Sequence, residues 1–487
     1  MSHDAKSKKA KPTETKSLGA KSVGTNIQGS RLIEESFWER DVWGDADVSH
    51  QPDPNLTPES TQEPITIHEG SSDHQPDTNT PTNSPDLLVI GGGIVGISAA
   101  LFYKRAYPEQ HVVLLERGGK PTGASTRNAG FACIGSISEH QADLQEASRE
   151  LVLDRICHRY EGLKFLRNTL PDTEIGYESC GGIEIFTDRD TFRACEAQIG
   201  EWNRELAARM GEREVYRVTT VNGMDAIENR VEGALHSGLM MKALHRRADE
   251  AGVETRWHHE VTHLSPGRVE VSQAERSQAE MGQLEGGQVE VSQAGRSQVA
   301  VSQAGRSQVE GSQVKTNRVV FTPSRTLLAT NGFTETLVGK LAGTQASATG
   351  IRPARGTVFV TRPIPNLPWR GTFHYHEGYV YFRNVGDRLM LGGARHIAKQ
   401  DEETTEFGVH PGILTWLTQF ADQVLQLPRG WHIEQQWSGI MGIAPQKEPI
   451  VRELQDGLWV AAGLSGMGVA IGMKLARDLV GLMGEPH

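Results

Sequence analysis

The chain has 487 residues, with 50 lysines and arginines against 61 aspartates and glutamates, which gives a net charge of −11 at pH 7. At about 150 residues per domain, this length predicts two or three domains. The mild acidity argues against a protein that binds nucleic acid, because phosphate binding needs a concentrated basic face.

Cysteine usage and hydropathy indicate a cytoplasmic protein. The four cysteines are too few and too scattered for a disulfide framework, and no C-x-x-C pair suggests a metal or redox site. No apolar run reaches the ~18 residues that a membrane span needs, and the first residues lack the apolar core of a secretory signal. We therefore expect no membrane span. The cysteines are Cys133, Cys157, Cys180 and Cys195.

The first 85 residues predict little folded structure. Residues 1–35 contain almost no large apolar groups to offset the entropy of ordering the chain, so we expect a disordered tail. Residues 47–85 carry seven prolines and seven acidic residues but no Lys or Arg, which predicts an acidic flexible linker. Between them, residues 36–46 include Phe37, Trp38 and Trp43, and we expect a packing arm that docks on the domain surface.

The segment after the linker predicts a dinucleotide-binding site. The apolar run Leu87–Ile90 is typical of a buried parallel strand, and it leads into a G-x-G-x-x-G motif and an Ala-rich helix that ends at about Tyr107. A second buried strand, residues 111–115, precedes Glu116, which stands where a carboxylate accepts hydrogen bonds from an adenosine ribose. The pyrophosphate is expected at the helix N-terminus. The glycines of the motif are Gly91, Gly93 and Gly96.

Two further glycine-rich segments favour FAD over NAD. The small, polar loop at residues 123–131 follows the expected ribose strand, and a flavin needs such close backbone approach along its ribityl chain and ring. The cluster at residues 463–472 enters an apolar helix that we expect to run to about Met483. Backbone N–H groups at the start of this helix could stabilise negative charge on a reduced flavin ring.

A ten-residue repeat interrupts the chain from Val271 onward, with copies such as VSQAGRSQVA and VSQAGRSQVE. A regular period can form a small β-solenoid, but each copy has only about two or three small apolar residues, too few for a stacked core. We expect residues 268–317 to form instead the expanded tip of a β-hairpin with arms at residues 261–264 and 319–321.

A strand pair at residues 378–383 and 388–393 carries the first candidates for a substrate site. Alternation along a strand places Tyr379, Tyr381 and Arg383 on one face, and an arginine beside two aromatic rings can hold an amino-acid carboxylate with two hydrogen bonds. A structural arginine at a sheet edge is an equally good interpretation.

Other residues near this strand pair are secondary candidates. Arg395 is a second possible carboxylate ligand, and Arg352 and Arg355 are weaker ones. His374 and His376 have the spacing of metal ligands on a strand, but without further ligands nearby we expect surface histidines and no metal.

These segments together resemble the FAD-dependent oxidoreductases of the D-amino-acid oxidase, glycine oxidase and sarcosine oxidase superfamily. The resemblance rests on the G-x-G-x-x-G motif, Glu116, the loop at residues 123–130, the strand end at 327–332 and the glycines at 466–468. It covers the chain from Asp86 to the end, apart from the repeat. The resemblance implies an α/β (α+β) fold in which a Rossmann-like FAD-binding domain is interleaved with a mixed-sheet substrate domain.

The resemblance also implies domain boundaries and cofactor contacts. Residues 86–150, 231–336 and 456–487 are assigned to the FAD-binding domain, and residues 151–230 and 337–455 to the substrate domain. Cys133 is interpreted as a core residue, not as a covalent flavin anchor. The expected FAD-binding residues are Gly91, Gly93, Ile94, Val95, Gly96, Glu116, Arg117, Ser125, Thr126, Asn128, Ala129, Gly130, Val261, Ala329, Thr330, Gly466, Met467, Gly468 and Val469.

Two positions depart from the pattern of the superfamily. Met441 stands where a glycine-oxidase-like segment carries a carboxylate-binding arginine, and Met390 stands where a sarcosine-oxidase-like strand carries an oxygen-activating lysine. A positive charge that favours superoxide beside the flavin is therefore missing. We expect a dehydrogenase or a slow oxidase.

The resemblance implies that the substrate is an amine or amino acid whose C–N bond is oxidised by hydride transfer to flavin N5, with an unknown electron acceptor. The cofactor carries this chemistry, and the protein supplies orientation and a dry site. The catalytic candidates are Tyr379, Tyr381, Arg383 and Arg395. The alternative is a flavin-binding assembly or interaction protein with vestigial catalysis, which the two methionines favour.

Overall fold

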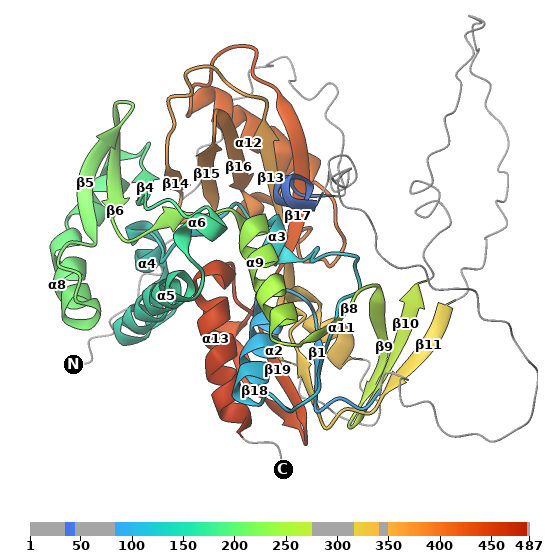
Figure 1. The fold of residues 1–487 in the computed structure, drawn as a ribbon. Helices are drawn as coiled ribbons and strands as arrows, with labels where there is room; N and C mark the ends of the chain where they lie inside the picture. Colours follow the sequence, from blue (N-terminus) through green and yellow to red (C-terminus); the bar gives the residue numbers. More distant parts are fainter. Residues whose placement is uncertain (1–34, 44–82, 275–315, 340–348, 485–487) are drawn as a thin grey trace, which may run out of the picture.

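The computed structural model describes residues 35–43, 83–274, 316–339 and 349–484 (Figure 1). Residues 1–34 of the expected tail, 44–82 of the expected arm and linker, and 275–315 of the repeat lie outside the described residues. Within them, two large sheets dominate, and the chain passes from one to the other and back. No helix among these residues is long and apolar enough to cross a membrane.

A six-stranded sheet carries the nucleotide-binding motif. Its strand order is β18-β19-β12-β1-β2-β8, and all neighbours are parallel except the edge strand β18. Because β18 pairs with β19, residues 450–455 belong to this sheet. The expected domain boundaries stay predictions. The strands are β1 (Leu87–Ile90), β2 (Val112–Leu115), β8 (Glu254–Arg256), β12 (Arg325–Leu328), β18 (Ile450–Gln455) and β19 (Leu458–Ala462).

Both faces of this sheet are covered, which explains the continuous apolar run of β1. Leu87 and Val89 pack against three helices, and Leu88 and Ile90 pack on the other face against a small three-stranded sheet of order β11-β10-β9. The helices are α2 (Ile94–Ala106), α9 (Ser237–Glu250) and α13 (Gly468–Met483). The small sheet contains β9 (His259–Ser265), β10 (Arg268–Ala274) and β11 (Thr316–Phe321).

The repeat is inserted between β10 and β11, which pair antiparallel. The arm before the repeat is therefore β10, and the expected arm at residues 261–264 lies in β9, on the other side of β10. Val269 and Val271 are fully buried, so the alternation of a strand continues into the residues expected to form the insert. The hairpin-tip and solenoid interpretations of residues 275–315 stay predictions.

An eight-stranded mixed sheet forms the second large unit. Its order is β17-β13-β16-β15-β14-β4-β6-β5, with β4 and β14 parallel and all other neighbours antiparallel. α12 (Pro411–Gln423) packs its apolar side on this sheet around Phe359 and Phe382. The strands are β4 (Gly182–Ile185), β5 (Tyr216–Val221), β6 (Met224–Asn229), β13 (Arg352–Thr361), β14 (Thr372–Tyr375), β15 (Val380–Val385), β16 (Arg388–Gly393) and β17 (Ile433–Ile443).

Shorter elements connect the two sheets. They include a two-stranded ribbon of β3 (Phe131–Ala132) and β7 (Gly233–Ala234). The remaining helices are α1 (Phe37–Trp43), α3 (Ala124–Arg127), α4 (Ile137–Asp143), α5 (Arg149–Thr169), α6 (Asp172–Ile175), α7 (Arg189–Glu196), α8 (Ile199–Met210), η1 (Asn331–Phe333), α11 (Thr334–Val338), η2 (Arg395–Ala398) and η3 (Pro445–Lys447). The expected combination of a parallel nucleotide-binding sheet with a mixed second sheet is confirmed.

Candidate active site

A cavity of about 860 Å³ is lined by residues of both large sheets. One end, the motif end, is lined by Gly91, Gly93, Glu116 and Ala329, which follow the carboxyl ends of β1, β2 and β12. Ligands of open α/β sheets bind at this edge. The other end, the tyrosine end, is formed by residues of the mixed sheet and its loops. Its lining includes His374, Tyr379, Tyr381 and Arg395.

The glycine motif brings backbone close to the cavity. Gly91 has a φ of +107°, and a Cβ there would lie 2.7 Å from the carbonyl oxygen of Ala329. A Cβ on Gly96 would overlap the Gly91 carbonyl oxygen, so this glycine is what lets α2 pack directly on the end of β1. α2 begins after Gly93 and has no acidic residue in its first turn. Its N-terminal N–H groups therefore present partial positive charge to a phosphate.

Glu116 is held in place by backbone donors. Its Oε2 accepts from the N–H of Gly92 at 2.9 Å, and its Oε1 accepts from the N–H of Gly118 at 3.0 Å. Burial raises the pKa of Glu116, while these two N–H groups act in the opposite direction. Each carboxylate oxygen can accept a further hydrogen bond, so the side chain is oriented to receive ribose hydroxyls.

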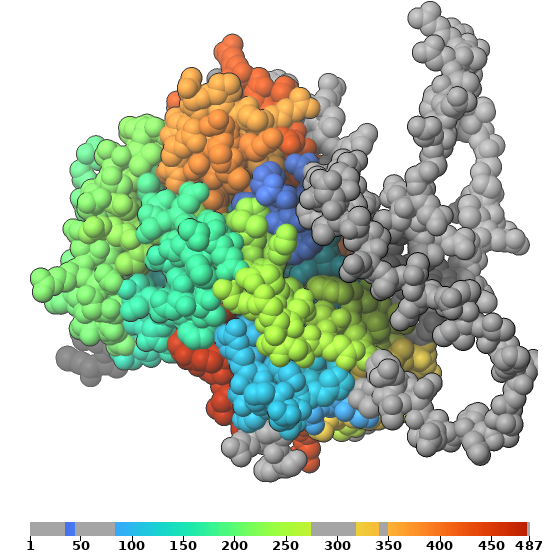
Figure 2. All heavy atoms as spheres, viewed as in Figure 1, coloured from blue at the N-terminus to red at the C-terminus, as the bar shows by residue number. Residues whose placement is uncertain are grey.

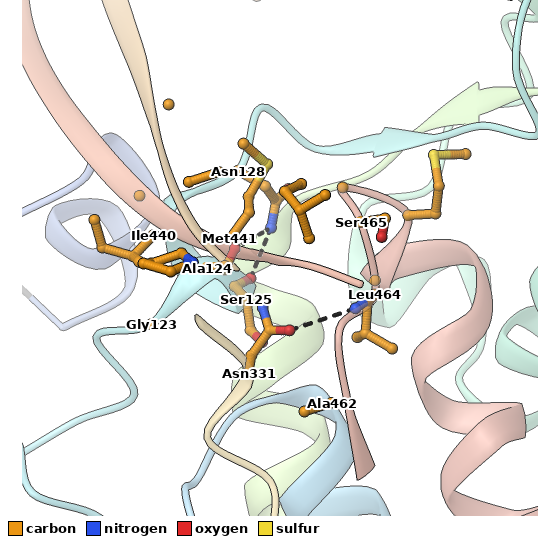
Figure 3. Close-up of a pocket in the computed structure, with 18 of the residues that line it drawn as sticks. Gly123, Ala124, Ser125, Asn128, Asn331, Ile440, Met441, Ala462, Leu464 and Ser465 are labelled. Carbon is orange, nitrogen blue, oxygen red and sulfur yellow. Dashed lines mark hydrogen bonds between the residues drawn. The ribbon is translucent and has the colours of Figure 1, made fainter. Parts of the chain in front are cut away.

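The loop that contains α3 is stabilised by its own asparagine. The Asn128 side-chain amide donates to the carbonyl oxygens of Ala124 and Ser125 at 3.0 and 2.9 Å (Figure 3). Its Oδ1 accepts from the N–H of Gly130 at 2.8 Å. The Ser125 hydroxyl accepts from the N–H of Ile94, which ties this loop to the start of α2. The loop and the glycine motif thus form one continuous wall.

Asn331 organises the opposite wall. It follows β12, and its Oδ1 accepts from the N–H of Leu464 at 3.4 Å (Figure 3). The same oxygen accepts from the N–H of Gly463 at 3.1 Å. The chain then turns through Ser465 into α13, whose first residues line the cavity. The expected cofactor residues did not include Asn331, although its place at the end of a buried strand within residues 327–332 was a usable signal.

Most of the expected FAD-binding residues line the cavity. Three do not: Gly96 packs α2 against β1, Gly130 lies beneath the guanidinium of Arg383, and the Thr126 hydroxyl donates to Glu39 and to the Pro121 carbonyl oxygen. Those that line it are Gly91, Gly93, Ile94, Val95, Glu116, Arg117, Ser125, Asn128, Ala129, Val261, Ala329, Thr330, Gly466, Met467, Gly468 and Val469.

The tyrosine end has an aromatic wall. The ring of Phe131 packs edge-on against His374, with centroids 5.3 Å apart, and against Tyr381, with centroids 5.8 Å apart. Burial raises the pKa of Tyr381 to about 12, so its hydroxyl stays protonated. Tyr379 lines the cavity beside this wall.

Arg383 lies outside the cavity, contrary to the proposed carboxylate role. Its side chain is buried, and its Nη1 donates to the carbonyl oxygens of Gly130 and Leu235 at 2.9 and 2.8 Å. Tyr381 and Arg383 are two positions apart on β15 and share a face of the strand, as expected. The strand runs away from the cavity, however, so the guanidinium of Arg383 lies beside the ribbon of β3 and β7. The structural interpretation of Arg383 fits these contacts.

The other candidate arginines differ in their partners. Arg352 pairs with Glu403 at 3.1 Å, and Arg355 pairs with the buried Glu402 at 2.6 Å. Arg395 lines the cavity and makes no ion pair within the described ranges. It is therefore the arginine at the tyrosine end whose charge is available to an anion.

His374 is buried, so its interpretation as a surface histidine was wrong. It lies on β14, an interior strand of the mixed sheet, and its Nε2 is 3.1 Å from Oε2 of Glu232. Burial acts to lower the pKa of His374, but the Glu232 carboxylate prevails and raises it. Glu232 also accepts from the N–H groups of Ile134 and Gly135, which fixes the carboxylate. No group of three or more metal-binding side chains occurs among the described residues.

The two methionines occupy different positions. Met441 lines the cavity, with its Sδ near Gly466 at the start of the C-terminal glycine loop. Met390 is fully buried in a cluster with Trp38 and Trp437 and does not line the cavity. Cys133 lines the cavity, and burial raises the pKa of its thiol well above the ordinary value, which keeps it protonated.

The chain belongs to the FAD dependent oxidoreductase family, whose family model matches residues 86–482. Its fold is similar to solved structures of that kind. Glycine oxidase from Bacillus cereus ATCC 14579 is 16% identical, with 83% of this chain and 99% of that chain covered and a TM-score of 0.56. L-proline dehydrogenase from P. horikoshii is 15% identical, with 82% and 94% covered and a TM-score of 0.56.

A third similar structure is iminodiacetate oxidase from Chelativorans sp. BNC1, at 18% identity, 82% and 96% coverage and a TM-score of 0.56. No curated protein matches the chain. FAD is the cofactor of this family, and the motif end fits it. The α2 N-terminus faces the cavity without an acidic side chain, and the Glu116 carboxylate is held for ribose hydroxyls.

Proposed function

We propose that the protein oxidises a C–N bond of an amino acid or amine. The observation that carries the proposal is Arg395, a guanidinium that lines the tyrosine end and makes no ion pair in the described part of the chain. A carboxylate is the natural partner for such a group. The names of similar structures, which include glycine oxidase, L-proline dehydrogenase and iminodiacetate oxidase, support this substrate class.

In this proposal the side chains of the tyrosine end bind and orient the substrate. Arg395 holds the carboxylate, and the ring of Tyr381, packed on Phe131, excludes water from the reacting carbon. FAD, when bound, supplies the hydride acceptor. The substrate reacts as the neutral amine, whose lone pair forms the C=N bond. Because the hydrogen leaves the carbon as a hydride, no protein side chain has to remove a proton from carbon. The protonated Tyr381 hydroxyl donates a hydrogen bond and does not serve as a base.

The second candidate is a flavin-binding assembly or interaction protein. Met441 favours it, because this apolar side chain lines the cavity where the superfamily pattern predicts a carboxylate-binding arginine. In the first candidate Arg395, the first residue of η2, takes the place of that arginine. Both candidates bind FAD, so only a reaction separates them.

Anaerobic spectroscopy tests the proposal. The FAD-loaded protein is mixed with D- and L-amino acids, N-methylglycine and polyamine derivatives, and the flavin absorbance near 450 nm is recorded. We expect at least one of these compounds to bleach the flavin. If none of these compounds bleaches the flavin, the proposal of amine oxidation is contradicted, and the flavin-binding interaction protein is favoured.

A further inference from the structure

The short helix α1 packs against residues that are about 90 positions later in the sequence. Ser36 and Glu39 cap the helix reciprocally: the Ser36 N–H donates to Glu39 Oε2 at 2.9 Å, and the Glu39 N–H donates to Ser36 Oγ at 3.1 Å. Trp38 is only 1% exposed. A seven-residue helix is not stable alone in water, so its conformation depends on what it contacts.

Three hydrogen bonds join this segment to the loop that contains α3. The Ser36 hydroxyl donates to the carbonyl oxygen of Thr126 at 2.6 Å, and the Trp38 indole donates to that of Asn128 at 2.7 Å. The Thr126 hydroxyl donates to Oε1 of Glu39 at 2.9 Å. Asn128 lines the cavity, whereas Trp38 and Glu39 do not, so the segment supports this wall from behind.

A buried ion pair reinforces the same contact. The Arg127 guanidinium donates to both carboxylate oxygens of Glu39, at 3.1 and 3.3 Å. Glu39 is fully buried and Arg127 nearly so. Burial raises the pKa of Glu39, and the charge of Arg127 opposes this shift. Since Arg127 also lines the cavity, loss of Glu39 would remove the carboxylate that faces this buried guanidinium at the wall of the FAD site.

The segment also reaches the mixed sheet and α9. The Gln435 side chain on β17 donates to the Glu35 carbonyl oxygen at 2.7 Å, and Trp38 packs with Met390 and Trp437. A Cβ on Gly238 in α9 would lie 2.6 Å from the Trp38 carbonyl oxygen. Figure 2 shows the blue atoms of α1 at the surface between the yellow-green atoms of α9 and the orange atoms of the mixed sheet.

We propose that residues 35–43 are a clamp of the FAD site, which holds the loop at residues 123–130 in the conformation that binds the cofactor. Glu39 and Trp38 are positioning residues: they act through Arg127 and Asn128. The proposal requires only that FAD is the cofactor and does not depend on which bond is oxidised. FAD affinity is therefore set in part by residues that precede the nucleotide motif by about 50 positions.

Two conservative variants of the full chain test the clamp. Glu39→Gln removes the charge that faces Arg127, and Trp38→Phe removes the indole donor to Asn128 while keeping an aromatic ring. Asp41→Asn is the matched control, since Asp41 lies on the same helix but pairs with His236 at an exposed position. The dissociation constant of FAD is measured by fluorescence quenching on each apoprotein, and the melting temperature of each apoprotein is recorded.

We expect the FAD dissociation constant to rise about ten-fold for Glu39→Gln, equal to about 1.4 kcal/mol, and about five-fold for Trp38→Phe. Asp41→Asn should stay within about two-fold of the wild type, because exposed pairs contribute little. Adding Arg127→Gln to Glu39→Gln should cost less than the two single changes together.

A merely structural arm would give a different result. The melting temperatures of the apoproteins would fall, but the FAD dissociation constants of Glu39→Gln and Trp38→Phe would match that of Asp41→Asn. That outcome would overturn the proposal. If Glu39→Gln does not fold, Trp38→Phe alone decides between the two results.

Discussion

The two ends of the cavity are built in different ways. The motif end is shaped by backbone, through the left-handed turn at Gly91, the N-terminus of α2 and the two N–H groups that hold Glu116. The tyrosine end is shaped by side chains of the mixed sheet and its loops, where His374 is paired with the buried Glu232 and Arg395 makes no ion pair among the described residues. A site made of backbone tolerates few substitutions, whereas a site made of side chains changes with each residue that lines it.

The largest expected effect is at the motif end, for Gly96→Ala. The added Cβ overlaps the Gly91 carbonyl oxygen, and this clash outweighs the better helix propensity of alanine. We expect FAD binding to weaken roughly a hundred-fold, measured as flavin retained after purification and by titration. Gly200→Ala in α8 is the control, since a Cβ there meets nothing within 4 Å. If Gly96→Ala binds FAD as tightly as the wild type, the claim that backbone shapes the motif end is contradicted.

The substitution Arg395→Met should impair the tyrosine end and leave the motif end intact. Loss of a charged hydrogen-bonding partner is worth about 2 kcal/mol, so kcat/KM for a carboxylate substrate should fall roughly thirty-fold, while the FAD dissociation constant stays unchanged. Arg352→Met is the matched control, because Arg352 also lines the cavity but already pairs with Glu403. An equal loss of kcat/KM in both variants would show that Arg395 has no particular role in binding the carboxylate.

Glu116→Gln should have a moderate effect confined to the motif end. The amide keeps one acceptor oxygen and loses the other, so FAD binding should weaken about ten-fold. Because burial raises the pKa of Glu116, wild-type affinity should decline as the pH falls toward that pKa, and the variant should lack this dependence. Glu254→Gln, a half-exposed acid on the neighbouring strand β8, should bind FAD normally at every pH.

His374→Asn should show the smallest effect, on stability and not on cofactor binding. The Glu232 carboxylate raises the pKa of His374, so the charged pair stabilises the fold below the ordinary histidine pKa of about 6.5 and is lost as the pH rises through the raised value. The wild type should exceed the variant in melting temperature by a few degrees at pH 6 and by less at pH 9. Equal differences at both pH values would refute the pairing of His374 with Glu232.

The comparison of the two ends also explains what could be predicted from sequence. The strand β1, the glycine motif and Glu116 follow local rules, and the structure places them as expected. Arg383 and His374 could not be placed, because their surroundings depend on which strands neighbour β14 and β15 and on what lies beneath them. The strand β10 was missed because its residues from Val271 onward have the sequence of the repeat.

One measurement tests the central claim most directly: the product balance of a single anaerobic turnover. The FAD-loaded protein is reduced with a limiting amine or amino acid, and the nitrogen and carbonyl products are quantified against flavin bleached. Oxidation of a C–N bond predicts one carbonyl compound and one ammonia or amine released for each flavin reduced. Reduction of the flavin only by alcohols, with no nitrogen released, would contradict the account.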